Sequence, residues 1–415
     1  MATSLRDARA ALVADNTRRG RAFGVALADL IDGALAPVVE DWRAQTPVAL
    51  IALGSYARRE LCPGSDVDVV LLVSDRRRDR AERSVKELAE QLWYPLWDAG
   101  FVTGHGTRSV KQSLSLADAD LDALTAHLEI RHVAGDATMT AELARRSREL
   151  AVRRRDRVLR ALADGSRERR AKPGPIAEML DPDLKDGAGG LRDVQALGWA
   201  GHTFGDPGGV ECLSARGFVT ADDVARLDVA HERLLDVRVA LHRVVVGRSD
   251  RLSLQEQDAV ASLLGIESAD QLVRELATAA RDVAWIASDA WARLGDFRAG
   301  PPGRVARQDR VLAEGVVLRD FRVTITGDGP VRALDVLEAA AAAAEVDAPF
   351  DRASLVRLRE MQPPTWDVWQ RAAFLRLLRA GRRAIPVFEA LDHEGVLPQL
   401  LPEWEHVRSL PQRNA

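Results

Sequence analysis

The sequence predicts an α+β fold in which a small mixed sheet with helices is followed by a helical bundle. Two apolar runs rich in β-branched residues, Val48–Leu53 and Val67–Val73, have the length and composition of buried strands. Residues 191–297 instead carry apolar positions at the spacing of amphipathic helices. Breakers rich in proline and glycine, at 172–175 and 300–303, separate these regions.

The elements follow in order along the first region. Residues 4–43 predict one or two amphipathic helices before the first strand. After that strand, Gly54 and Ser55 turn the chain into a short helix over Tyr56–Leu61, which Pro63-Gly64 ends. The second strand follows, and then a helix over residues 79–97, an extended segment over 101–109 and mostly helix over 114–162.

The breakers divide the chain into three predicted parts, over residues 1–170, 171–299 and 300–415. The first part holds the strands, and the second is the helical bundle. In the third part, short β-like runs between residues 311 and 325 precede a return to helix at Ala333.

The segment from Gly54 to Asp68 carries the strongest chemical signal. Gly54 and Ser55 stand where the chain enters a helix, and free backbone N–H groups at a helix start can cradle phosphate. Asp66 and Asp68 alternate with valines, so both carboxylates are expected on one side of the sheet. Such a pair can hold Mg²⁺, or Mn²⁺ in its place, together with substrate phosphates. An isolated Asp-x-Asp would indicate only a polar strand start, but the full order of elements favours a site for a metal-bound nucleoside triphosphate.

A second glycine-rich segment covers residues 181–195. Gly189 and Gly190 predict a loop that another group can approach closely. Lys185 and Arg192 flank this loop with positive charge suited to phosphate or carboxylate contacts. The alternative is a tight turn between domains, held by an ion pair of Arg192 with the adjacent Asp193, and the two interpretations are compatible.

These motifs resemble those of the nucleotidyltransferase superfamily, which includes DNA polymerase β-like enzymes, and more narrowly those of the PII uridylyltransferase (GlnD) family. In the first motif the matching positions are Gly54, Tyr56, Arg58, Glu60, Leu61, Ser65, Asp66 and Asp68. Arg59 stands where the family usually has glycine, and Ala57 replaces another glycine. The second motif is similar to the family's Lys-Glu-Gly-Pro-Gly-Gly-Leu-Arg-Asp-Ile-Gln, and a related segment occurs in glutamine synthetase adenylyltransferases.

The resemblance implies a polymerase β-like nucleotidyltransferase domain followed by a helical domain of the PII-uridylyltransferase type. It implies that Asp66 and Asp68 are the catalytic metal ligands. The residues that it implies as nucleotide contacts are Gly54, Ser55, Arg58, Ser65, Lys185, Gly189, Gly190 and Arg192. Polymerase-type enzymes usually carry a third carboxylate on a later strand. The corresponding strand here offers His105, which leaves Glu129 and Asp193 as alternatives.

The resemblance also marks what this sequence lacks. The family normally continues into an HD phosphohydrolase domain and two ACT sensor domains. This sequence ends where the first HD histidine segment is expected, and Asp392-His393 has the reverse order of a His-Asp pair. We therefore expect no nucleotide-removing activity and no glutamine sensor in this chain.

Composition limits the remaining classes. The net charge is −4, and acidic and apolar residues interleave the arginines of 145–160, which favours a solvated helix face over a nucleic-acid site. Without a run of eighteen apolar residues or a signal peptide, we expect no membrane span. Cys62 and Cys212 give neither a disulfide framework nor zinc spacing, which fits a reducing cytoplasm.

By this resemblance, the chain is expected to transfer UMP or AMP from UTP or ATP to a tyrosine of the trimeric PII nitrogen-signalling protein, releasing pyrophosphate. The richness in arginine and alanine favours AMP, because family members from high-GC Gram-positive bacteria are adenylyltransferases. One alternative is a non-catalytic regulator that binds nucleotide or PII, although both metal carboxylates are present. Another is a modifier of glutamine synthetase, but such relatives carry two catalytic halves and this chain has one.

Overall fold

The computed structural model describes residues 4–43, 47–74, 78–205, 208–245, 248–300, 309–327 and 329–410. The chain forms two compact units, of which one extends to Ala290 and the other covers Trp291–Leu410. The predicted α+β class is confirmed, with a small mixed sheet and a helical region after it. The predicted boundary at residues 170 and 171 lies inside the first unit and stays a prediction.

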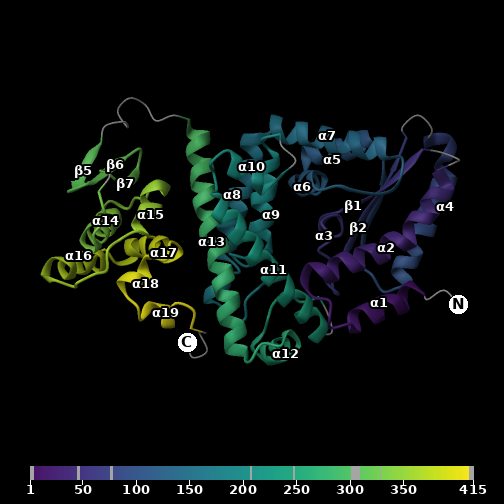
Figure 1. Ribbon diagram of the computed structural model, residues 1–415. Coiled ribbons are helices and arrows are strands. Elements are labelled where there is room, and N and C mark those ends of the chain that lie inside the picture. Colours follow the sequence, from purple (N-terminus) through teal and green to yellow (C-terminus); the bar gives the residue numbers. More distant parts are fainter. Residues whose placement is uncertain are drawn as a thin grey trace. The chain divides into compact units, whose positions relative to one another are not determined.

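A four-stranded mixed sheet lies in the first 135 residues of the first unit, with the strand order β3-β2-β1-β4 (Figure 1). Its strands are β1 (Val48–Leu53), β2 (Val67–Val73), β3 (Thr103–Arg108) and β4 (Arg131–Gly135). Strand β1 runs antiparallel to β2 and β4, whereas β2 and β3 are parallel. This register places Asp68 opposite Leu53 on one side and beside Gly104 on the other.

Both faces of the sheet are covered, which explains why β1 and β2 are almost continuously apolar. On one face, Leu50 and Leu71 pack in a core with residues of α2 (Gly20–Arg43) and α4 (Arg78–Asp98). On the other face, Ile51 and Val70 pack with residues of α5 (Val110–Ala119) and α7 (Ala137–Arg153) (Figure 1). Asp68 alternates with the residues of the first core, so it lies on the α5 and α7 face at the start of β2.

The other helices of the first unit are α1 (Leu5–Ala14), α3 (Gly54–Ala57), α6 (Leu121–Leu128), α8 (Arg155–Ala171), α9 (Leu191–His202), α10 (Val210–Ala215), α11 (Ala221–Val244) and α12 (Leu254–Leu264). Helix α13 (Ala269–Ala299) continues into the second unit. The helical region after residue 191 therefore agrees with the predicted bundle. Helix α11 also reaches the sheet region, because Val239 belongs to the same core as Leu50 and Leu71.

Helix α2 is long and apolar enough to cross a membrane by length and composition alone. In the structure, however, its side chains Phe23, Leu27, Ile31 and Leu35 are fully or almost fully buried in the core beneath the sheet. We therefore interpret α2 as the core helix of a folded domain.

Two local predictions were wrong. The short helix begins at Gly54 and ends at Ala57, not at Tyr56 and Leu61. It ends early because Arg59 adopts a left-handed conformation with φ of 59°, which a helix cannot continue through. Strand β4 was also missed inside the stretch expected to be mostly helical. It is short, and its pairing with β1 contains an irregularity between Leu50 and Ile51.

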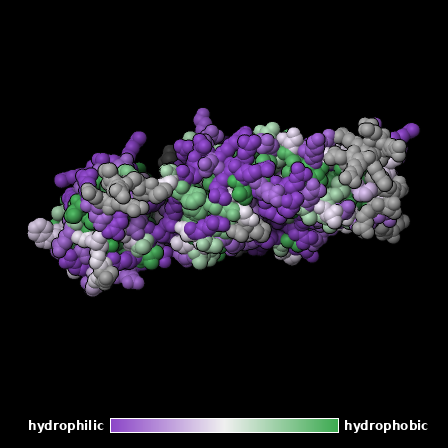
Figure 2. All heavy atoms as spheres, turned by 90° about the horizontal axis from the view of Figure 1, so that it is seen from above, coloured by the Kyte–Doolittle hydropathy of each residue, from purple (hydrophilic) through white to green (hydrophobic). Residues whose placement is uncertain are grey.

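The second unit contains a three-stranded antiparallel sheet with the order β5-β6-β7, which agrees with the β-like runs expected between residues 311 and 325. Its elements are β5 (Arg310–Ala313), β6 (Val316–Arg319), β7 (Arg322–Ile325), α14 (Ala333–Val346), α15 (Arg352–Leu358), α16 (Val368–Arg379), α17 (Ile385–His393), α18 (Leu397–Leu400) and α19 (Trp404–Val407). The alanines 339–344 of α14 are buried in this unit. On the face shown in Figure 2, hydrophilic side chains predominate and apolar ones are scattered among them.

Candidate functional site

The Asp68 carboxylate is held between two glycines on neighbouring elements. A Cβ atom added to Gly104 on β3 would lie 2.1 Å from Oδ1 of Asp68, and one added to Gly54 would lie 3.2 Å from Oδ2. Gly54 also has φ of 55°, a conformation that L side chains rarely adopt. These two glycines therefore leave the space in which the carboxylate sits.

Asp66 directly precedes β2, whereas Asp68 is the second residue of that strand. Burial raises the pKa of Asp68, and the neighbouring negative charge of Asp66 raises it further. The positive charges of Lys185 and Arg58 act in the opposite direction. Two carboxylates that repel one another beside cations form a site prepared for additional positive charge.

Arg248, on the segment after α11, contacts the exposed member of the pair. Its Nη1 donates a hydrogen bond to Oδ1 of Asp66 at 2.7 Å. Both side chains are about half exposed, at 45% and 55%, so solvent screens the ion pair and it contributes little to stability. A weak, accessible contact of this kind can be exchanged for a ligand.

Residues 250–252 form backbone hydrogen bonds with the second glycine-rich motif and connect it with the first motif. The backbone N–H of Leu184 donates to the carbonyl of Asp250 at 2.9 Å, and that of Leu252 donates to the carbonyl of Pro182 at 2.9 Å. This short pairing supports the segment that carries Lys185, whose charge acts on Asp68. The positive charge of Lys185 therefore acts on Asp68 from the second motif, and its contact with nucleotide stays a prediction.

A buried polar network connects the same segment to the loop before Asp66. The backbone N–H of Gly64 donates to Nδ1 of His242 at 3.1 Å. Because Nδ1 accepts, the proton of the neutral ring lies on Nε2, which is 2.9 Å from Oδ1 of Asp250. Arg238 donates to both oxygens of Asp250, at 2.7 and 3.2 Å, and its Nη1 lies 3.5 Å from Sγ of Cys62. Hydrogen bonds from His242 and the charge of Arg238 hold the pKa of Asp250 below its usual range against the effect of burial.

Arg58 forms ion pairs with two carboxylates, those of Glu60 and Glu129. Its Nε donates to Glu60 at 2.8 Å and its Nη1 donates to Glu129 at 2.7 Å. Burial disfavours the charge, but Glu129 and Glu60 more than offset this and raise the pKa of Arg58. Its predicted role in neutralising charge during a reaction therefore remains a prediction, and its observed role is to fix the end of the first motif.

The glycines of the second motif make close packing contacts. A Cβ atom on Gly189, where φ is 83°, would lie 2.2 Å from the carbonyl oxygen of Ala280 on α13. A Cβ atom on Gly190 would lie 2.8 Å from the carbonyl oxygens of Gly187 and Leu184. These contacts fit the alternative of a tight turn between elements, and nucleotide contact by the two glycines stays a prediction.

The charged residues of that motif do not form the pair that the turn interpretation expects. Asp193 is buried and accepts from the guanidinium of Arg169 at 2.6 Å and from the N–H of Gly189 at 2.9 Å. Arg192 instead lies 3.5 Å from Asp186 and donates to Gln195 at 3.1 Å. Arg192 is only partly buried, so it retains access to solvent.

Ser55 and Ser65 occupy different settings. Ser55 is half-buried in the first turn of α3, next to Gly54. The Ser65 hydroxyl accepts the backbone N–H of Cys62 at 2.8 Å, which closes the turn that leads to Asp66. Ser65 therefore shapes the loop, while its predicted contact with nucleotide is untested.

His105, at the position of the usual third carboxylate, and its alternatives Glu129 and Asp193 all contact other residues of the chain. His105, on the strand beside β2, packs against the rings of Trp93 and Trp97. Glu129 binds Arg58 and Asp193 binds Arg169. Among the described residues, no group of three or more His, Cys, Asp and Glu side chains could hold a metal.

His242, Arg238 and Arg248 were not predicted as site residues. They lie more than 170 residues after the first motif, and their roles depend on a tertiary contact. The sequence offers a weak signal for Arg238 and His242, because they stand among the apolar residues Val237, Val239, Ala240 and Leu241 and need polar partners when they are buried.

Comparison with known proteins gives consistent matches across the chain. Residues 157–291 match the family model described as GlnD PII-uridylyltransferase, and residues 11–115 match the nucleotidyltransferase model DUF294. A bifunctional uridylyltransferase/uridylyl-removing enzyme of Streptomyces coelicolor is 38% identical over 98% of this chain and 49% of its own length. Proteins of the same description from Mycobacterium tuberculosis and Corynebacterium glutamicum are 35% and 31% identical, each over 88% of this chain. The chain spans about half the length of the curated relatives it matches.

Proposed function

Because the chain belongs to the GlnD family of PII uridylyltransferases, we propose that it transfers a nucleoside monophosphate to a tyrosine hydroxyl of a PII signalling protein and releases pyrophosphate. The observation that carries this proposal is the Asp66 and Asp68 pair, with its mutual repulsion, beside Lys185. The relatives are described as uridylyltransferases, which supports UTP as the donor. The composition of the chain supports ATP, and the experiment below separates the two.

The carboxylates fit Mg²⁺ because their oxygens are hard ligands and leave room for phosphate and water. When bound, the ion would polarise the phosphoryl oxygens and neutralise charge on the leaving pyrophosphate. We assign its binding to Asp66 and Asp68. Arg248 would release Asp66 and become available to the triphosphate anion, since its present contact is half-exposed.

The remaining residues orient the reactants. Gly54 and Ser55 would receive the β- and γ-phosphates at the start of α3, with Lys185 supplying positive charge from the opposite motif. The tyrosine oxygen would then attack the α-phosphate in line with the departing pyrophosphate. Its proton leaves with solvent or a base that the structure does not single out. Most of the catalysis would come from positioning and charge compensation.

The test is to incubate the chain with purified PII, Mg²⁺ and either UTP or ATP, and to weigh PII by intact-mass spectrometry. A mass gain equal to UMP or AMP establishes the reaction and identifies the donor. The double variant Asp66→Asn/Asp68→Asn should show no gain while circular dichroism shows an unchanged fold. Full transfer by that variant would overturn the assigned site, and modification of glutamine synthetase instead of PII would overturn the assigned acceptor.

A further inference from the structure

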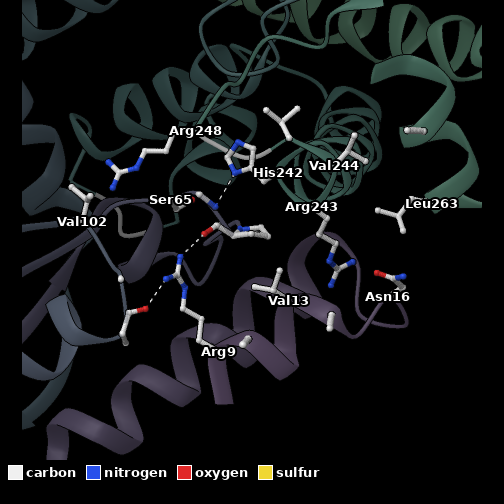
Figure 3. A pocket seen from close by; sticks show the side chains of 18 of the residues that line it. Arg9, Val13, Asn16, Ser65, Val102, His242, Arg243, Val244, Arg248 and Leu263 are labelled. Carbon is white, nitrogen blue, oxygen red and sulfur yellow. Dashed lines mark hydrogen bonds between the residues drawn. The ribbon is translucent and has the colours of Figure 1, made fainter. Parts of the chain in front are cut away.

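A cavity of about 1140 Å³ lies next to the candidate active site. It borders the loop Pro63–Ser65, but its lining, among the described residues, does not include Gly54, Asp66 or Asp68. Helix α1, the connection between α4 and β3, the end of α11 and helix α12 form its walls (Figure 3). It is therefore a separate space that shares one loop with the site already described.

The charge of this cavity is one-sided. Four arginines line it, Arg6, Arg9, Arg243 and Arg248, together with His242. The lining residues that the structure describes include no aspartate or glutamate. The protein as a whole carries a net charge of −4, so this concentration of positive charge is local and not a general property of the surface.

Arg9 is held in place by neutral groups only. It donates to the carbonyl of Ala99 at 2.7 Å and to that of Pro63 at 3.1 Å, and its guanidinium lies 4.3 Å from the ring centre of Phe101. Its Nε is buried without a hydrogen-bond partner. Burial lowers the pKa of Arg9, and repulsion from Arg248 lowers it further, so its charge is not compensated.

Arg243 shows the same pattern on the opposite wall. It donates to the main-chain carbonyl of Asp15 at 2.7 Å and lies over the ring of Phe23. Its Nε is also buried without a hydrogen-bond partner. Burial lowers the pKa of Arg243, the Asp15 charge opposes this in part, and Arg19 adds repulsion. Arg9 and Arg243 thus bring to the lining positive charge that is at most partly offset by a carboxylate.

Apolar side chains form much of the remaining lining, together with the polar residues Asn16, Ser65 and Ser262. Figure 3 labels four of the apolar ones, Val13, Val102, Val244 and Leu263. Its volume of about 1140 Å³ lies just above the range of about 300–1,000 Å³ that is typical of small-molecule sites, which combine apolar walls with a few polar anchors. Positive anchors on apolar walls match a small molecule that has anionic groups attached to an apolar body.

We propose that this cavity is a second binding site, for a small molecule that carries phosphate or carboxylate groups on an apolar body. Two residues that line the cavity also indicate how a bound molecule would act on the neighbouring candidate active site. Arg248 lines the cavity and binds Asp66, and His242 lines it and accepts from Gly64. An anion bound here competes with Asp66 for Arg248 and acts on the loop that leads to the metal carboxylates.

The test uses the whole chain and the fluorescent anion 1-anilinonaphthalene-8-sulfonate, which joins a sulfonate to an apolar ring system. We expect saturable binding that inorganic phosphate or succinate displaces, and the more effective competitor identifies the anionic group. The variant Arg6→Gln/Arg243→Gln should bind the probe at least tenfold more weakly. The matched control is Arg145→Gln/Arg146→Gln, which removes the same charge from exposed positions on α7 and should bind within twofold of the parent.

Equal binding by both double variants, or no saturable binding at all, overturns the proposal. Thermal unfolding shows whether each variant is folded. If the Arg6 and Arg243 double variant is not, Ala259→Glu places a negative charge at an exposed position of the lining without disturbing a core, and it should weaken binding as well. Asp66→Asn/Asp68→Asn frees Arg248 from Asp66 and should bind the probe at least as tightly as the parent. Failure of the transferase assignment therefore leaves this result standing.

Discussion

Oδ1 of Asp68 occupies the place that a side chain on Gly104 would need, since an added Cβ atom would lie only 2.1 Å from it. The two residues are neighbours in the parallel pairing of β2 and β3. The position of the Asp68 carboxylate is thus set in part by the absence of a side chain at Gly104 on the adjacent strand.

Gly104→Ala should therefore lower the rate of transfer by at least about tenfold, because even a shift of about 1 Å in a reacting group is costly. Steady-state kinetics at varied Mg²⁺ would measure this, and we expect kcat to fall with the fold intact. The matched control is Gly106→Ala on the same strand. Its Cβ would meet the flexible guanidinium of Arg108 at 3.2–3.3 Å, which can move aside. Equal activity of the two variants would contradict the assigned role of Gly104.

Asp68→Asn should abolish activity and stabilise the protein. Burial and Asp66 raise the pKa of Asp68, so the folded state binds this proton more tightly than the unfolded state does. The charged carboxylate therefore costs stability at any pH above its usual pKa. Transfer should fall at least about 100-fold, as when a charge-stabilising group is removed, while the melting temperature at pH 7 rises. The exposed Asp164→Asn serves as a control that should change neither property. A lower melting temperature for Asp68→Asn would show that the carboxylate is stabilising.

Two substitutions at His242 should separate its two hydrogen bonds. An asparagine oxygen can replace Nδ1 as acceptor for Gly64, whereas a glutamine nitrogen can replace Nε2 as donor to Asp250. If the Gly64 contact positions the loop before Asp66, His242→Asn should keep most of the activity and His242→Gln should lose about tenfold. The measurements are kcat and the apparent KM for Mg²⁺, and thermal unfolding gives the stability of each variant. If His242→Gln kept more activity than His242→Asn, the hydrogen bond from His242 to Asp250, and not the one from Gly64, would be the contact that supports activity.

The free energy of unfolding should decrease as the pH falls from about 6.5 to about 4, because His127 binds a proton more readily in the unfolded chain. Burial, reinforced by the charge of Arg108, lowers the pKa of this histidine to about 4. The unfolded chain therefore binds the proton first, and stability present above pH 6.5 is lost progressively on acidification, by roughly 3 kcal/mol at most. Urea unfolding at several pH values would measure this for the parent and for His127→Leu, in which the dependence should be smaller by that amount. An unchanged pH dependence in the variant would exclude His127 as its source.

The sequence predicted the two central strands well, because continuous apolar runs are a local signal for strands buried on both faces. Asp68 lies within the second of these strands as predicted, whereas Asp66 precedes it. The end of the short helix was less predictable. Arg59 stops it by adopting a left-handed conformation, although arginine gives no such signal, and the family usually has glycine at this position.

Other features depend on contacts between distant segments. Strand β4 is too short to show a period, and it exists because β1 offers an unpaired edge. The contact between Gly64 and His242 joins residues 178 positions apart. Lys185 was predicted from its motif, but only the structure shows that the hydrogen bond of Leu184 to Asp250 holds its segment where its charge acts on Asp68.

The network from Arg238 to Leu252 has a consequence for anyone who wishes to shorten the protein. A fragment that ended near residue 170 would keep the sheet, both carboxylates and the first glycine turn. It would lose the acceptor for Gly64, the partner of Cys62, the cation on Asp66 and the core residue Val239. The smallest excised piece that preserves the loop before Asp66 must therefore continue at least through Leu252, so the candidate site depends on residues from both ends of the first unit.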